Sequence, residues 1–214
     1  MKIAIIGAGF SGLSAGFHLA GNNVNVTIFE SGDKPGGLAV GFTQDKWKWS
    51  LEEYYHHLFT NDSSVLNLAK EVGQELVIKR PKASTFIDGS MYKLDSPISL
   101  LTFNKLSFID RFRTGSVMAY LKLTSSWKML ENITAKEFII KWNGGKAWEV
   151  LWKPLFVKKF ADYSNQVPAS WFWARIKKRT TQLAYPKGGF LSFAEKLEDY
   201  IKRYNGKVHY NLPV

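Results

Sequence analysis

The sequence contains no cysteine, and this absence excludes several kinds of chemistry. Disulfides, thiolate metal ligands, cysteine nucleophiles and a cysteinyl link to a flavin all require that residue. No apolar run approaches the roughly 20 residues needed to cross a bilayer. A strand-like run already begins at Lys2, which leaves no room for a signal peptide before it. The expectation is therefore a cytoplasmic protein.

Acidic residues are also scarce, with 18 Asp and Glu against 29 Lys and Arg, a net charge of +11. The excess is local, because residues 141–180 carry nine basic and two acidic side chains. The same segment holds five of the eight tryptophans, namely Trp142, Trp148, Trp152, Trp171 and Trp173. Three explanations stay open: a helical core with solvated lysines, a peripheral membrane surface, or attraction of an anionic substrate. Nucleic-acid binding is not expected, since no recognition motif accompanies the charge.

One glycine motif organises the chain. Gly7-Ala8-Gly9-Phe10-Ser11-Gly12 has the G-x-G-x-x-G spacing. It follows the apolar run Lys2–Ile6, expected to be a strand buried on both faces, and precedes a helix expected over residues 11–20. A second strand over residues 24–29 ends at Glu30. The spacing alone also fits an unrelated glycine turn, but this order of elements favours a dinucleotide site.

Each residue type in the motif has a physical task. Gly7 permits the tight turn from strand to helix, Gly9 lets a pyrophosphate approach the backbone, and Gly12 lets the helix pack closely on the strand. The start of the helix offers unpaired N–H groups and a partial positive charge to phosphates. Glu30 is placed to accept hydrogen bonds from a ribose diol.

The continuation Glu30-Ser31-Gly32-Asp33-Lys34-Pro35-Gly36-Gly37-Leu38 resembles the second fingerprint of the FAD-binding amine-oxidase superfamily. That superfamily includes protoporphyrinogen oxidase-like and phytoene desaturase-like enzymes. Lys34 stands where arginine is more usual, so the charge is kept but bidentate phosphate binding is lost. The resemblance implies non-covalently bound FAD rather than NAD, with the glycine pair close to the pyrophosphate or the flavin.

Adjacent histidines follow at His56 and His57. On a strand they would point to opposite faces and so could not easily share a metal ion. A packing or surface role is favoured, and the resemblance also allows proximity to the cofactor. No residue is singled out as catalytic, and no metal ligand is expected.

The middle of the chain leaves the nucleotide-binding pattern. Asp62-Ser63 is expected to cap a helix that Gly73 ends. Asp88-Gly89-Ser90 lies between two strand-like triplets and predicts a hairpin, which does not occur inside a β-α-β unit. Residues 97–179 are expected to be mostly helical.

Local signals position the helices of this region. Capping-box spacings at Ser107–Asp110 and Thr134–Glu137 predict two helix starts. A further helix is expected from Lys146, with Trp148, Trp152 and Leu155 on one side and a kink at Pro154. Another is expected to begin near Pro168. In the resembled superfamily such a helical insertion covers a substrate pocket.

The end of the chain returns to an alternating pattern. Tyr185-Pro186-Lys187-Gly188-Gly189-Phe190 precedes a helix with apolar residues at 3.6-residue spacing. A strand is expected over residues 208–212. In the resembled superfamily a Pro-x-Gly-Gly turn marks the return to the FAD domain, and a valine beyond the next strand touches the adenine, a role that falls to Val214 here.

The predicted fold is α/β, with a Rossmann-like FAD-binding sheet, incomplete in this chain, and an inserted mainly helical substrate domain. The expected boundaries are 1–75, 76–183 and 184–214. Only three strands, 2–6, 24–29 and 208–212, are found for a sheet that normally has about five or six. The chain is therefore expected to be an N-terminal fragment or a truncated relative. The fragment is favoured, with a half-built substrate pocket and no activity of its own. The candidate cofactor-binding residues are Gly7, Ala8, Gly9, Phe10, Ser11, Gly12, Glu30, Ser31, Lys34, Gly36, Gly37, Leu38 and Val214.

The resemblance implies an FAD-dependent oxidoreductase that transfers hydride from a C–N or C–C bond to flavin. The expected substrate is a small molecule, either an amine or a hydrophobic compound. Two alternatives stay open: a flavin-dependent mutase similar to UDP-galactopyranose mutase, and a truncated, non-catalytic nucleotide-binding module. The sequence does not indicate the substrate, the electron acceptor or the oligomeric state.

Overall fold

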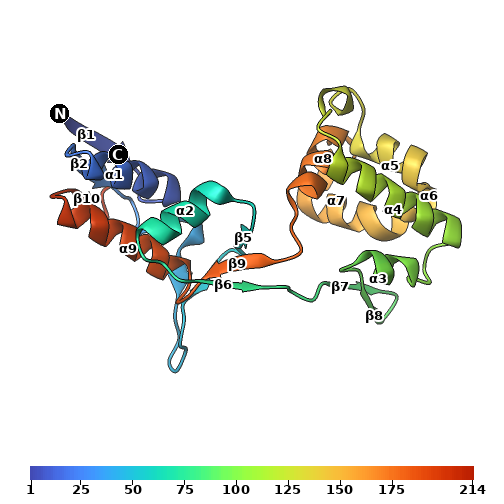
Figure 1. Ribbon diagram of the computed structural model, residues 1–214, viewed down its shortest axis with the longest axis horizontal. Helices are drawn as coiled ribbons and strands as arrows, with labels where there is room; N and C mark the ends of the chain where they lie inside the picture. The colour runs from blue at the N-terminus through green and yellow to red at the C-terminus, as the bar shows by residue number, and fades with distance from the viewer. The chain divides into compact units, whose positions relative to one another are not determined.

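The computed structural model describes residues 1–214 and divides into two compact units (Figure 1). Unit 1 consists of Met1–Arg80 and Thr180–Val214, and unit 2 is Pro81–Arg179. The division lies a few residues from the boundaries expected from the sequence. Unit 1 gains its extra residues because residues 76–79, before unit 2, pair with residues 183–186, after it.

A three-stranded parallel sheet forms one edge of unit 1. Strands β1 (Lys2–Ile6), β2 (Asn25–Phe29) and β10 (Lys207–His209) lie in the order β1-β2-β10. Helix α1 (Phe10–Gly21) connects β1 to β2. The three strands predicted for the nucleotide-binding sheet are therefore present, and the third comes from the far end of the chain.

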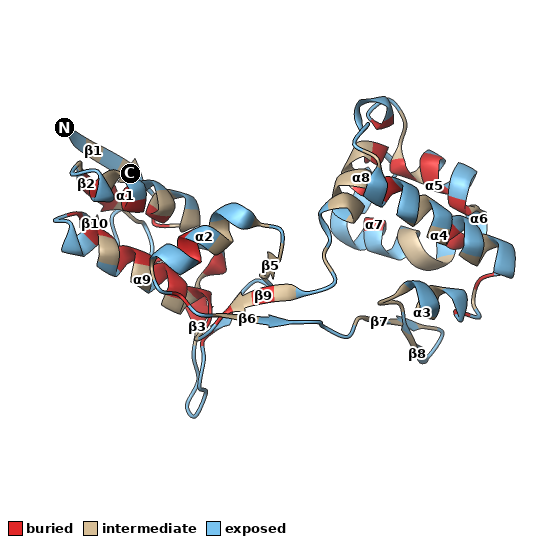
Figure 2. Cartoon of the chain, in the orientation of Figure 1, coloured by how far each residue is buried: buried red, intermediate tan, exposed pale blue.

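Two helices cover one face of this sheet. Helix α1 packs against α9 (Phe190–Arg203), and Figure 2 shows the buried side of α9 in red. A Cβ on Gly16 of α1 would lie 2.9 Å from Cδ1 of Ile201 and 3.0 Å from Cδ1 of Ile28, so a small residue is required there. The core includes Leu13, Phe17, Val26, Ile28, Phe193, Leu197 and Ile201.

The expectation that β1 is buried on both faces is wrong. Its residues alternate between partly buried and exposed positions, and the Ile6 side chain is 69% exposed. Ile3 and Ile5 face the helices, whereas Ala4 and Ile6 face the uncovered side. The helices of unit 1 supply a layer for only one face of this strand.

The rest of unit 1 consists of short antiparallel strands and one helix. Strands β3 (Gly41–Phe42) and β4 (Leu51–Glu52) pair after the single turn η1 (Gly37–Ala39). Strand β9 (Leu183–Pro186) lies between β5 (Leu58–Phe59) and β6 (Leu76–Lys79).

The helix predicted after Asp62 is α2 (Ser63–Glu71), and Gly73 follows it with φ +67°. Asp62 occupies the N-cap position but makes no side-chain capping bond. Its Oδ2 instead accepts a hydrogen bond from the N–H of Phe59 at 2.9 Å. The carboxylate therefore fixes the end of β5 rather than the first turn of the helix.

Unit 2 begins with the predicted hairpin. Strands β7 (Ser84–Ile87) and β8 (Ser90–Lys93) pair antiparallel. The two turn residues, Asp88 and Gly89, both have positive φ values, +47° and +76°, as a two-residue type I′ turn requires. Helix α3 (Pro97–Leu101) follows.

The remainder of unit 2 is helical, as predicted. Ser107 caps α4 by accepting a hydrogen bond from the N–H of Asp110, and Thr134 and Glu137 form the full capping box of α5. The elements are α4 (Phe108–Leu123), η2 (Lys128–Leu130), α5 (Ala135–Asn143), α6 (Gly145–Ala147), η3 (Trp148–Trp152), α7 (Lys153–Phe160), η4 (Ala161–Asn165) and α8 (Ala169–Lys178). No helix of the structure combines the length and apolar character needed to cross a membrane.

The expected kink at Pro154 takes the form of a π-helical turn, η3, directly before α7. Proline has no N–H for the bond to the preceding turn, and the wider π turn accommodates that loss. Trp148 and Trp152 pack into the core of unit 2, but Leu155 is 52% exposed and Phe156 is buried in its place. The prediction for Leu155 is wrong because the π turn rotates the residues that follow it.

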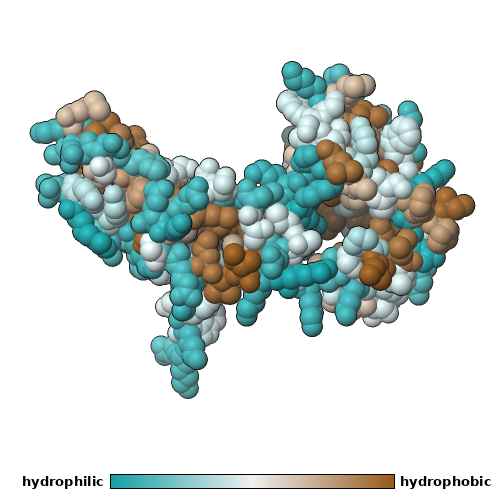
Figure 3. Space-filling model, in the orientation of Figure 1, coloured by the Kyte–Doolittle hydropathy of each residue, from teal (hydrophilic) through white to brown (hydrophobic).

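Hydrophobic side chains remain exposed where α3 contacts α4. Figure 3 shows brown, hydrophobic side chains on the surface of unit 2 near the beginning of α4. The exposed residues there are Ile98, Leu101, Phe108, Ile109 and Phe112.

Candidate dinucleotide-binding site

The glycine loop between β1 and α1 has the geometry that its sequence predicts. Gly7 has φ +91°, a region that favours glycine, and its N–H donates to the carbonyl of Phe29 at 2.7 Å. A Cβ on Gly12 would lie only 2.0 Å from the carbonyl oxygen of Gly7. Glycine at position 12 is therefore required for the helix to begin where it does.

The second glycine pair packs against this loop. The buried Gly36 donates its N–H to the carbonyl of Ala8 at 2.9 Å and forms a parallel bridge with Gly9. Gly37 has φ +58°, and a Cβ there would lie 3.0 Å from Cα of Gly9. The sequence predicts that this pair lies beside the cofactor, and in the structure the pair also makes the backbone contact between the two fingerprints.

Glu30 lies at the end of β2 with its carboxylate against the glycine loop. Its Oε2 accepts the N–H of Ala8 at 2.6 Å, and its Oε1 accepts the N–H of Gly32 at 2.8 Å and the hydroxyl of Ser31 at 3.3 Å. Burial raises the pKa of the carboxyl, but the hydrogen bonds from Gly32, Ala8 and Ser31 outweigh it, so the pKa lies below its ordinary value. A carboxylate has about four lone-pair sites, so acceptor capacity remains for a ligand hydroxyl.

The start of α1 is open to an anion. Its N-cap residue, Gly9, has no side chain to bond the first N–H groups, and the first turn contains no acidic residue. These unpaired N–H groups and the helix dipole together favour a negative charge at this point. A Cβ on Gly9 would meet nothing nearer than Cα of Gly37 at 3.7 Å, so no other side chain fills the position beside Cα of Gly9.

The chain segment after β10 lies beside the Glu30 turn. The N–H of Glu30 donates to the carbonyl of His209 at 2.8 Å, and the N–H of Leu212 donates to the carbonyl of Glu30 at 2.9 Å. Val214 follows two residues later and is 78% exposed. The structure thus brings residues from both ends of the chain to one turn, but leaves the Val214 side chain largely exposed.

Two other predicted residues are exposed. Leu38 is 74% exposed, and Lys34 is exposed in the loop after Glu30. Lys34 lies close enough to α9 to act on Glu195, whose pKa is raised by burial and by Asp199 and Glu198, with Lys34 opposing them. Its positive charge is therefore available next to the Glu30 loop.

Sequence reasoning missed a buried carboxylate in unit 1. Glu52 is 7% exposed, and its oxygens accept hydrogen bonds from the hydroxyl of Tyr185 at 2.7 Å and the N–H of Phe190 at 3.0 Å. Burial raises the pKa of Tyr185, and the bond to Glu52 raises it further. Glu52 thus binds the N-terminal end of α9 to β4 and β9.

The Pro-x-Gly-Gly turn explains part of this arrangement. A Cβ on Gly189, which has φ +96°, would lie 2.2 Å from Oγ of Ser50, and that Oγ donates to the carbonyl of Gly188 at 3.1 Å. The turn can therefore approach the strand that carries Glu52. The sequence shows the Pro-x-Gly-Gly turn and Glu52 separately. Residue spacing does not reveal that the two meet, because they lie far apart in the chain.

The adjacent histidines have ring-packing roles. The ring of His56 lies 5.9 Å from that of Phe190, and its Nδ1 lies 2.6 Å from the carbonyl of Tyr54. The ring of His57 packs edge-on against Phe59 at 4.9 Å. The structure contains no group of three or more His, Cys, Asp or Glu residues placed to hold a metal ion.

Comparison with known proteins adds to this geometry. A probable UDP-galactopyranose mutase from Klebsiella pneumoniae is 25% identical over 171 residues, which cover 79% of this chain and 43% of that protein. A mitochondrial protoporphyrinogen oxidase from Nicotiana tabacum is 32% identical over 132 residues, which cover 59% of this chain and 25% of that protein. The alignments therefore span less than half the length of either relative.

Solved structures show the same fold. An oxidoreductase from Methanosarcina mazei superposes with a TM-score of 0.71 at 20% identity, covering 99% of this chain and 51% of that one. The family described as flavin containing amine oxidoreductase matches residues 10–214, a range that includes the second half of the glycine loop, Glu30 and the whole of unit 2. The chain therefore belongs to the flavin containing amine oxidoreductase family.

Proposed function

We propose that this chain forms the FAD-binding part of an oxidoreductase and holds the cofactor non-covalently. The pyrophosphate would lie at the glycine loop Gly7–Gly12 and the start of α1, with Lys34 contributing charge. Glu30 and Ser31 would face the ribose, and Gly36, Gly37 and Leu38 would line the path toward the flavin. Val214 would lie at the adenine end.

The observation that carries this proposal is the contact between Glu30 and the glycine loop. An acid at the end of β2 reaches Ala8 at 2.6 Å, and Gly36 of the second fingerprint is bonded to the same residue. A ribose acceptor and an anion-binding helix start thus lie side by side, as an adenine dinucleotide requires. A glycine turn with no ligand would not need this acid against it.

When bound, the flavin supplies a two-electron acceptor for hydride from a C–N or C–C bond. The chain's own contribution is to bind and orient that group through backbone N–H donors and one carboxylate. Small-molecule substrates are characteristic of the family, and we propose a hydrophobic or amine substrate for this protein. No residue of the chain is assigned as an acid or a base.

Absorption spectroscopy of the purified protein tests the cofactor directly. Oxidised flavin bands at about 370 and 450 nm are expected, because they are properties of the cofactor itself. Acid precipitation should release the flavin into the supernatant. A colourless protein that binds NAD but not FAD in titration would overturn the proposal. Flavin that stays with the precipitated protein would show that the cofactor is bound covalently, which would overturn the proposal of non-covalent binding.

A matched pair of glycine variants tests the position of the pyrophosphate. Gly9→Ala has room for its methyl group, because the nearest atom is 3.7 Å away, so the fold should persist while FAD affinity falls. Gly145→Ala, in unit 2, also meets no neighbour within 4 Å and should leave FAD affinity unchanged. The larger Gly9→Val should abolish FAD binding, because its side chain would exclude the pyrophosphate from the loop. If Gly9→Val protein still copurifies with stoichiometric flavin, the placement is wrong.

A mutase activity is the second candidate, favoured by the Klebsiella relative and its coverage of 79% of the chain. Activity should be measured on the protein at its full encoded length. Turnover of a sugar nucleotide that requires reduced flavin but consumes no electron acceptor would indicate a mutase. Substrate oxidation coupled to acceptor reduction would indicate the oxidoreductase. Stoichiometric flavin without any turnover would favour a non-catalytic module.

A further inference from the structure

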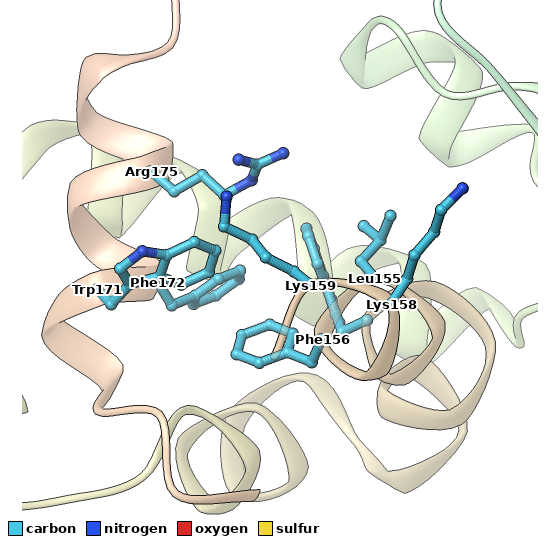
Figure 4. A pocket seen from close by; sticks show the side chains of 8 residues that line it. Leu155, Phe156, Lys158, Lys159, Trp171, Phe172 and Arg175 are labelled. Carbon is cyan, nitrogen blue, oxygen red and sulfur yellow. The ribbon is translucent and has the colours of Figure 1, made fainter. Parts of the chain in front are cut away.

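Unit 2 contains a cavity of about 320 Å³ that the flavin site does not use. It lies between α7 and α8 (Figure 4). Trp152, from the π turn, also lines it. Its aromatic walls come from Trp152, Phe156, Trp171 and Phe172. Lys158, Lys159 and Arg175 supply its basic rim.

The aromatic walls are fixed by mutual packing. Trp152 meets Phe172 edge-on with ring centroids 4.8 Å apart, and Phe156 meets Trp171 edge-on at 5.5 Å. Phe156 and Phe172 are buried in the core of unit 2, with 2% and 0% exposure. The cavity is therefore largely pre-formed, as binding pockets for small molecules usually are.

The basic rim gathers positive charge over one ring. Nζ of Lys159 and Cζ of Arg175 each lie 5.7 Å from the centroid of the Trp171 ring, and Figure 4 shows these two side chains extending over the aromatic wall. Partial burial lowers the pKa of Arg175, and the nearby charge of Arg179 lowers it further. Lys159 and Arg175, both held over the Trp171 ring, together favour an anion between them.

The protein does not neutralise this rim. Glu149, on the turn before α7, pairs with Lys153 at 2.7 Å instead, and no carboxylate forms an ion pair with Lys158, Lys159 or Arg175. The indole N–H of Trp152 is also buried without a hydrogen-bond partner. Buried donors are rarely left unpaired in native proteins, and π turns such as the one that carries Trp152 are frequent at functional sites.

From this arrangement we propose that the cavity binds an amphiphilic anion. A phosphate or carboxylate group would lie against Lys159 and Arg175, and the apolar body would pack on Trp171 and on Leu155, which is 52% exposed. Such a ligand is either a free small molecule or the headgroup region of an anionic lipid. The inference is independent of the flavin site, because it concerns binding to unit 2 and needs no cofactor.

Isothermal titration calorimetry with octyl phosphate below its micelle concentration tests the proposal. Octyl phosphate should bind about tenfold or more tightly than inorganic phosphate or 1-octanol, since neither of those combines the charge with the apolar body. The double variant Lys159→Gln/Arg175→Gln should weaken this binding by about tenfold or more.

The matched control removes the same charge from the same basic segment without touching the cavity. Lys141→Gln/Lys146→Gln changes two exposed residues and should bind octyl phosphate within about twofold of the wild type. Circular dichroism should show both variants folded. Equal binding by the two double variants, or octyl phosphate no tighter than its two fragments, would overturn the proposal.

Vesicle sedimentation then identifies the source of the anion. The probes are vesicles of phosphatidylcholine alone and vesicles containing about one third phosphatidylglycerol. If the cavity variant alone loses binding to the anionic vesicles, the ligand is a lipid headgroup. If both double variants sediment with those vesicles to the same degree, surface charge explains the membrane attraction and the cavity's ligand is a free small molecule.

Discussion

The two units differ most in charge. Unit 1 contains 12 basic and 11 acidic residues, a net charge of +1, whereas unit 2 contains 17 basic and 7 acidic residues, a net charge of +10. Nearly all of the protein's excess charge therefore belongs to the unit without the glycine loop. A dinucleotide carries phosphates, and yet the unit proposed to bind it is almost neutral.

The two proposed sites would recognise an anion in different ways. Unit 1 would use backbone, through glycines without side chains and the open start of α1. Unit 2 uses side chains: Lys159 and Arg175 over Trp171. The first design depends on atom positions to within an ångström, and the second depends on charge and ring surface. Substitutions should therefore damage the two units in different ways.

The largest effect is expected for Gly12→Ala in unit 1. Its Cβ would lie 2.0 Å from the carbonyl oxygen of Gly7, so backbone must move, and the free energy of unfolding should fall by about 3 kcal/mol. Urea unfolding followed by circular dichroism measures the change. Gly145→Ala in unit 2 should change stability by less than about 0.5 kcal/mol, and a similar loss in both variants would contradict the contrast between the units.

The next largest effect is expected for Glu52→Gln. The amide would replace one carboxylate acceptor with a donor facing the hydroxyl of Tyr185 or the N–H of Phe190. The free energy of unfolding should fall by about 2 kcal/mol. The neighbouring Glu53→Gln is the control, because Glu53 is exposed, and it should cost less than about 0.5 kcal/mol. Equal thermal denaturation of the two variants would show that the buried carboxylate is not a stabilising contact.

A gain in stability is expected for Ala161→Gly in unit 2. Ala161 has φ +47° and ψ −121° at the end of α7, a conformation that glycine adopts more readily than alanine. Relief of this strain should raise the free energy of unfolding by about 1 kcal/mol. A urea titration that shows a loss instead would mean that the backbone at this position is not strained.

The smallest effect is a change in acid stability at Glu30. Its pKa is lowered from 4.5 in the folded protein, so the carboxylate stabilises the fold above that pH, and this contribution is lost as pH falls through the lower folded value. Between about pH 5 and pH 3 the wild type should lose stability more steeply than Glu30→Gln. Parallel pH profiles of the melting temperature would contradict the assigned hydrogen bonds.

The sequence predicts the local features of both units and misses the long-range ones. The loop 7–12 is predicted because glycines at this fixed spacing have few other uses, and Glu30 is predicted because it ends the next strand. The capping box of Thr134 and Glu137 is predicted because both residues lie within one helical turn. The contact of Gly36 with Ala8 and the approach of Glu52 to Phe190 join segments that are separated along the chain. Those contacts depend on folding geometry that periodicity does not contain.

Residue spacing also fails where the backbone departs from a regular helix. The α-helical period places Leu155 on the side of Trp152, but the π turn before Pro154 brings Phe156 there instead. In the sequence, only Pro154 indicated that the helix would be disturbed here, and it did not indicate which way the following residues would rotate. The same turn forms part of the cavity of unit 2, which the sequence indicated only as a basic, tryptophan-rich segment.

A fluorescence titration of FAD tests the central claim most directly. It compares the wild type with Glu30→Ala and with the control Asp33→Ala, an exposed acid in the same loop. The charge-assisted hydrogen bonds to the ribose predict a loss of about 1–3 kcal/mol in FAD affinity for Glu30→Ala and no change for Asp33→Ala. Equal FAD affinity in all three proteins would show that the dinucleotide does not lie at the end of β2.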